Sequence, residues 1–215
     1  MKKYLKLFAS FALVAAIAVG FTLAYLQKPL ETKTNTFTSS QKIDGTLTEP
    51  GWTNDFGEGG TWNDYLPNEA HAKDPKITIT NDSVSAYVAI KVNFKDSANA
   101  KISYTKFTTD YAKVFTGGML AMTAGTPGFN TTDWTDNTLD FAAKSADKDA
   151  MFFVYKTTIK GATTNPLFDY VKVNNDIVKG DQSLPTFKID IAGYAVQADE
   201  VSAADALDAL IEMAK

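Results

Sequence analysis

The chain has 215 residues, of which 45% are hydrophobic and 21% are charged. It can therefore bury a sizeable core, and it has the composition neither of a disordered chain nor of a polytopic membrane protein. All 21 basic residues are lysine, against 25 acids, and the net charge is -4. Because an acidic chain without arginine is poorly equipped to bind phosphate or guanine, we expect no nucleic-acid partner.

The chain has no cysteine and a single histidine, His71. The lack of cysteine excludes disulfides, thiolate metal sites, iron–sulfur clusters and cysteine nucleophiles. One imidazole also leaves little with which to build a histidine-based metal centre or a catalytic triad.

The N-terminus has the pattern of a secretory signal, with two lysines ahead of an almost unbroken apolar run, residues 7–26. We expect cleavage between Ala24 and Tyr25, although small residues also allow cleavage after Ala18. The run exceeds the usual signal core of roughly 7–15 residues, so an uncleaved membrane anchor is the alternative. Both interpretations export residues 25–215 and limit membrane contact to the apolar run. The exported part carries 18 lysines and 25 acids.

The exported part is rich in strand-forming residues, including 26 threonines in the whole chain. The best alternation runs over 86–94, where Val88, Ile90, Val92 and Phe94 share one face. Residues 76–80 alternate in the same way and precede an Asn-Asp-Ser turn, so we expect them to form a hairpin with 86–94. Further strands are expected at 34–38, 42–48, 151–159, 167–173 and 187–191.

Helix signals are few. A capping box at Ser202 precedes Leu207, Leu210 and Ile211 on one face, which predicts a helix over 203–214. A weaker pattern indicates a helix over 106–114. Many short strands separated by turn residues are typical of an all-β protein. We therefore expect a single antiparallel β-sandwich domain, residues 37–215, closed by a short C-terminal helix.

Several blocks in order along the chain resemble the exported TasA/camelysin family, which is processed by the SipW-type signal peptidase. They lie at 34–50, 73–81, 82–88, 165–168, 171–173 and 194–198, whereas residues 95–150 match poorly. The resemblance implies a jelly-roll-like β-sandwich at the cell surface or in the biofilm matrix of a monoderm bacterium. Some members of that family polymerise into fibres by exchange of an N-terminal strand, so the resemblance implies the same mode of assembly here.

After cleavage, residues 25–36 would form an extended N-terminal segment without a strong strand or helix pattern. Such a segment can complete a neighbour's sheet, and a repeated head-to-tail contact of this kind produces a filament. Pro29 has no backbone donor, which restricts the pairing. The alternative is a disordered leader that spaces the domain from the membrane. The expected donor residues are Tyr25, Leu26, Gln27, Lys28, Pro29 and Leu30.

Four aromatic residues crowd into the Gly/Asn/Asp-rich stretch 51–65: Trp52, Phe56, Trp62 and Tyr65. They could form a binding surface for polysaccharide or for a partner subunit. The sequence favours the simpler interpretation that a long loop tucks its aromatic rings over the edge of the core.

Camelysin-type relatives have been classed as metallopeptidases, which commonly need two imidazoles on one helical turn and a general base. His71 stands alone in a Pro/Asn-rich stretch that we expect to be a surface loop. We therefore expect no catalytic residue, no metal ligand and no enzymatic activity.

Calcium is a further candidate ligand, because it accepts carboxylates. The candidate groups, Asp133, Asp136 and Asp140, or Asp147 and Asp149, lack the spacing of an EF-hand, and a solvated acidic surface is the favoured interpretation. No cofactor is assigned.

The sequence therefore predicts an exported, non-enzymatic structural protein that binds copies of itself, with other matrix or cell-wall components as further partners. A monomeric surface adhesion or polysaccharide-binding module is the alternative, and a secreted metallopeptidase is a third.

Overall fold

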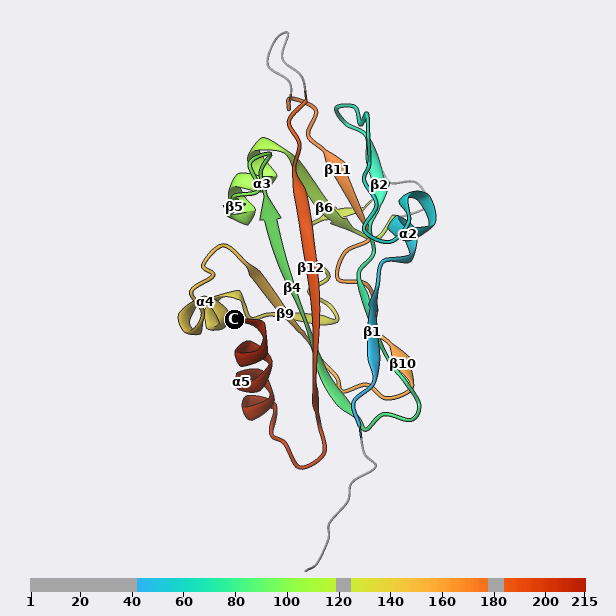
Figure 1. Ribbon diagram of the computed structural model, residues 1–215, viewed down its shortest axis with the longest axis vertical. Helices are drawn as coiled ribbons and strands as arrows, with labels where there is room; N and C mark the ends of the chain where they lie inside the picture. Colours follow the sequence, from blue (N-terminus) through green and yellow to red (C-terminus); the bar gives the residue numbers. More distant parts are fainter. Residues whose placement is uncertain (1–41, 119–124, 178–183) are drawn as a thin grey trace, which may run out of the picture. The chain divides into compact units, whose positions relative to one another are not determined.

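Antiparallel strand pairing organises the part of the chain that the computed structural model describes, residues 42–118, 125–177 and 184–215 (Figure 1). The signal or anchor, the cleavage site, the donor segment and the expected strand at 34–38 lie outside these residues. Among the described residues, no helix combines the length and the apolar character needed to cross a membrane.

The strands form three sheets, and every pairing is antiparallel. Sheet A has the order β1 (Gly45–Thr48), β3 (Lys76–Ile79) and β10 (Ala162–Thr163). Sheet B has the order β2 (Ala70–Ala72), β11 (Tyr170–Val173), β6 (Ala112–Thr116) and β7 (Thr126–Pro127). Sheet C has the order β12 (Lys188–Gln197), β4 (Ala86–Lys95), β9 (Met151–Tyr155) and β8 (Trp134–Asp136), and β5 (Lys101–Ile102) also pairs with β4.

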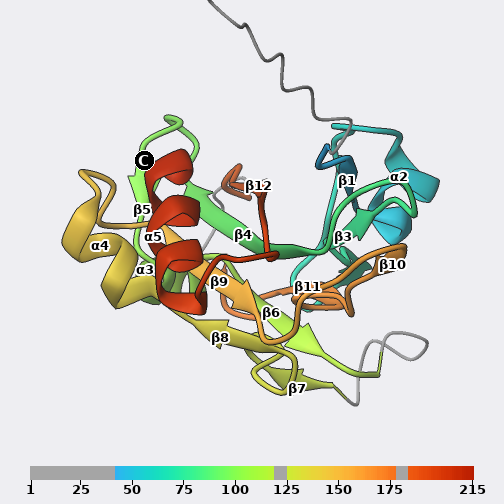
Figure 2. The same cartoon turned by 90° about the horizontal axis from the view of Figure 1, so that it is seen from below.

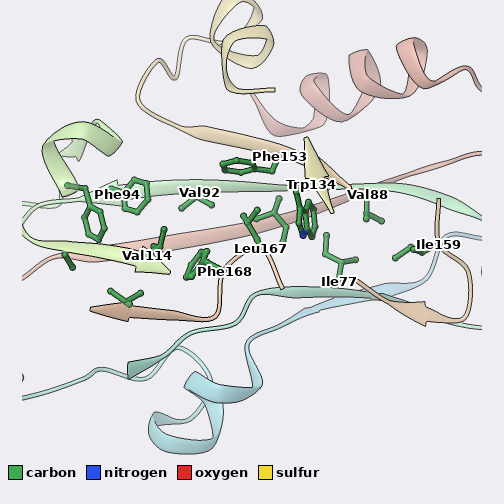
Figure 3. Close-up of a cluster of buried hydrophobic side chains, with 14 of the residues drawn as sticks. Ile77, Val88, Val92, Phe94, Val114, Trp134, Phe153, Ile159, Leu167 and Phe168 are labelled. Atoms are coloured by element: carbon green, nitrogen blue, oxygen red, sulfur yellow. The ribbon is translucent and has the colours of Figure 1, made fainter. Parts of the chain in front are cut away.

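The first core lies between sheet C and the other two sheets (Figure 3). Strand β4 contributes Val88, Ile90, Val92 and Phe94, which are all completely buried. Strands β3, β6 and β11 supply side chains from the opposite layer. The alternation predicted over 86–94 is therefore confirmed, because every second side chain of this strand enters the same apolar layer.

The second core lies on the other face of sheet C, under α4 (Thr138–Lys144) and α5 (Ala203–Ala214) (Figure 2). Because sheet C is covered on both faces, neighbouring residues of β9 enter different cores. Phe152 belongs to the second core and Phe153 to the first. This explains why 151–155 is apolar without alternation.

The C-terminal helix is confirmed. The Ser202 hydroxyl oxygen accepts a hydrogen bond from the backbone N–H of Asp205 at 3.2 Å and caps the helix. Leu210 and Ile211 are buried in the second core, and Leu207 packs against it.

One expectation about the fold is wrong, and another needs its bounds corrected. Strand β3 pairs with β1 and β10 in sheet A, whereas β4 belongs to sheet C, so 76–80 and 86–94 form no hairpin. Their alternation shows which face is buried but does not select a partner. The turn between them leads the chain from sheet A to sheet C. The helix expected over 106–114 is present as α3 (Tyr104–Asp110) but lies earlier in the chain, and Val114 already belongs to β6.

The described residues contain four helices instead of the one or two expected, since α2 (Pro50–Phe56) and α4 were not anticipated. Neither of these two helices is capped by the side chain of its own N-cap residue. Their sequences carry only partial start signals, namely Pro50 at the start of α2 and Asn137 with Asp140 at the start of α4.

Candidate functional site

Strand β12 leaves one edge of sheet C unpaired among the described strands. It pairs with β4 along its whole length of 10 residues, from Lys188 opposite Lys95 to Gln197 opposite Ala86. Strand β1 likewise pairs only with β3. An unpaired edge presents a row of N–H and C=O groups that can pair with another chain. These two edges approach each other (Figure 1).

A groove of about 210 Å³ lies between β1 and β3 on one side and β12 on the other. Its lining is mostly aliphatic and includes Ile43, Leu47, Ile77, Ile79, Gly193 and Ala195. At Gly193 the two sheets touch, because a Cβ atom there would lie 3.3 Å from the Leu47 Cβ. A groove lined by aliphatic side chains and by polar backbone groups, and flanked by strand edges, has the shape to receive an extended segment.

The expected donor residues, 25–30, lie outside the described residues. The described chain begins at Lys42, and the next residue, Ile43, already lines the groove and is 40% exposed. The described chain therefore begins beside the groove.

The structure brings the four predicted aromatic residues together around His71. Helix α2 carries Trp52 and Phe56, β2 carries His71, and the connection between them carries Trp62 and Tyr65. The His71 ring centroid lies 4.4 Å from that of Phe56, 5.2 Å from that of Trp62 and 6.0 Å from that of Trp52. The Tyr65 ring lies 5.6 Å from Trp62. These five rings form one continuous aromatic row, and each is half-buried.

The aromatic row is anchored at both ends. The Trp52 indole N–H donates to the Gly60 carbonyl at 3.2 Å, and the Tyr65 hydroxyl donates to the Pro185 carbonyl. The Tyr65 ring also lies 5.6 Å from Phe187, which reaches Phe107 in the first core. The row thus attaches the connection between α2 and β2 to the edge of the first core. Burial in this contact raises the pKa of the Tyr65 hydroxyl.

Helix α2 is held in place by charged residues that come later in the sequence, Lys73 and Asp74. The backbone N–H of Gly51 donates to the Asp74 carboxylate at 2.7 Å, and the same carboxylate pairs with Lys76 at 2.8 Å. Lys73 lies 4.8 Å above the Trp52 ring and pairs with Glu49 at 2.8 Å. Both Asp74 and Lys73 are buried. These two buried charges therefore fix the helix and its aromatic rings against β2 and β3.

The expectation that His71 lies in a surface loop is wrong. His71 pairs with Val171 of β11, and its side chain is only 20% exposed. Its Nδ1 atom lies 3.5 Å from an Asp55 carboxylate oxygen. Nothing in the sequence next to His71 predicts this, because its burial depends on the aromatic rings of α2 and the connection.

Four of the five candidate calcium ligands have other partners. The Asp133 carboxylate accepts from the side-chain amides of Asn130 and Asn165, each at 2.9 Å. Asp136 accepts from the Thr138 N–H, Asp140 from the Asn137 amide, and Asp147 pairs with Lys101. Within the described residues, no three histidine or acidic side chains converge on one point that would suit a metal ion.

Neither the family models nor the curated proteins that were compared with this chain match it. The TasA/camelysin resemblance consequently stays a hypothesis that rests on the sequence blocks alone.

Proposed function

We propose that this chain is an exported structural subunit of the bacterial cell surface or biofilm matrix, similar to the TasA/camelysin proteins. In this proposal the antiparallel domain is a jelly-roll-like sandwich, and subunits join when the N-terminal segment of one adds a strand to the next. The observation that carries the proposal is the edge of β12 that no described strand pairs with, beside the groove.

The donor segment has a suitable pattern for that groove. In an extended strand Leu26 and Leu30 lie on the same face, because side chains alternate with period two. They can therefore enter the groove together. The N–H groups of successive residues point to opposite edges of a strand, so Pro29 removes a donor from one edge only. The other edge, which carries Lys28 and Leu30, retains its donors for β12.

The first test compares residues 25–215 with residues 33–215 by electron microscopy and sedimentation. The longer chain should form fibres, whereas the shorter chain should stay monomeric and should bind an added 25–36 peptide. If the shorter chain forms the same fibres, residues 25–32 take no part in assembly and the proposal fails.

The second test fills the groove. Ala195→Phe places a ring in the groove and should block assembly. The matched control is Ala203→Phe in a separate groove of about 200 Å³ beside α5, and this variant should still assemble. Circular dichroism checks that both variants fold. Fibres from Ala195→Phe, or loss of fibres from both variants alike, would place the contact elsewhere.

A further inference from the structure

The chain segment that carries most of the aromatic row contributes acids and no lysine to this surface. Residues 49–72 contain five acids, Glu49, Asp55, Glu58, Asp64 and Glu69, and no lysine. The next cation along the chain, Lys73, is buried and paired with Glu49. A surface of this kind attracts positive ligands and repels negative ones.

The aromatic row is accessible from solvent. Helix α2 has no fully buried residue, and the Asp55 side chain is 52% exposed. Leu66, next to Tyr65, is 61% exposed. The rings are held in place by their own hydrogen bonds and ring contacts, so a ligand would meet a surface that is already ordered. Such preorganisation lowers the entropy cost of binding.

We propose that the aromatic row binds a polysaccharide of amino sugars with free amines. The rings of Trp62 and Tyr65 offer apolar surface and polar edges to successive sugar rings, whereas the Lys73 ammonium covers one face of Trp52. A continuous row suits an extended polymer better than a single sugar. Protonated amines complement the carboxylates of Asp55, Glu58 and Asp64 and are attracted to aromatic faces. The Trp52 ring already shows this contact with the Lys73 ammonium at 4.8 Å.

The inference goes beyond the assembly proposal and does not depend on it, since binding and assembly are measured separately. A lysine-rich peptide would satisfy the carboxylates alone, without making use of an extended row of rings. We therefore argue for the amino-sugar polymer and include the peptide as a competing ligand in the test.

The test is calorimetric titration of residues 25–215 with three six-unit ligands: a glucosamine oligomer, an N-acetylglucosamine oligomer and hexalysine. The pH is kept where the amines are protonated. The glucosamine oligomer should bind at least about tenfold more tightly than either of the others. If hexalysine binds equally well, the protein recognises positive charge alone. If the acetylated oligomer binds equally well, the protein does not recognise the free amines. Either result, or no binding of the glucosamine oligomer, overturns the proposal.

Variants separate the contribution of the rings from that of the charges. Trp62→Ala should weaken glucosamine binding about tenfold, whereas Tyr87→Ala, which removes a half-buried ring in the groove beside α5, should not. Glu58→Gln combined with Asp64→Asn should reduce the dependence of binding on salt, and asparagine tolerates the positive φ of 54° at position 64. Unchanged affinity in Trp62→Ala, with its fold intact by circular dichroism, would refute the role of the row.

Discussion

Leu210 provides a direct test of how α5 is attached to sheet C. Its side chain is completely buried in the second core, in the same cluster as Ala89 and Phe152. Leu210→Ala removes three carbon atoms, worth about 2.4 kcal/mol at about 0.8 kcal/mol per buried methylene. The cavity left behind adds to this loss, so we expect the free energy of unfolding to fall by about 2–5 kcal/mol.

Urea unfolding of residues 25–215, followed by circular dichroism, measures this loss as a lower midpoint with an unchanged slope. The melting temperature should fall by about 4–20 °C, since each kcal/mol corresponds to about 2–4 °C in a chain of this size. Leu139→Ala in α4 is the matched control, because Leu139 is 87% exposed and this variant should stay within about 0.5 kcal/mol of the original.

The reasoning is refuted if Leu210→Ala and Leu139→Ala have the same stability. It is also refuted if the helical signal of the original protein is lost in a separate, earlier transition. In that case α5 would be an independently opening unit instead of part of one cooperative fold.

Three further outcomes are expected. Ile90→Ala should cost about 2–5 kcal/mol in urea unfolding because the side chain is completely buried in β4, and a loss below about 0.5 kcal/mol would contradict that placement. Asp74→Ala should cost about 1.5–3 kcal/mol, since it removes the charged acceptor of the Gly51 N–H, and Asp74→Asn should lose less. Burial raises the pKa of Tyr104 above its ordinary 10.0, so the stability that this phenol contributes is fully present below pH 10 and is lost as the pH rises through the raised value. Tyr104→Phe should reduce that alkaline loss, measured as unfolding free energy against pH together with phenolate absorbance.

The pattern of the sequence determined which faces of the main strands are buried and where the last helix begins. The alternation over 86–94 and the Ser202 cap are local signals, and the structure has β4 and α5 at these positions. Such features follow from the geometry of a single element, so they can be deduced without knowledge of its neighbours.

Strand partners and the second core were decided by contacts between distant residues. Strand β3 has the alternation of a hairpin partner for β4, yet it pairs with β1 and β10. Helix α2 lacks a cap of its own and is instead held by Asp74, which lies 23 residues from the Gly51 that it caps. The entropy cost of bringing such distant residues together is offset only when the layers pack. No local sequence pattern therefore shows which segments will contact each other.

The candidate sites divide in the same way. The sequence determined that aromatic rings gather at 51–65 and that acids dominate around them. Only the tertiary structure decided that His71 completes the row and that β12 ends its sheet beside β1. Whether a strand is central or at an edge depends on which other strands pair with it. Strand β12 resembles any other half-buried strand in its own residues, and it stands at an edge because the pairing of the described strands of sheet C ends there.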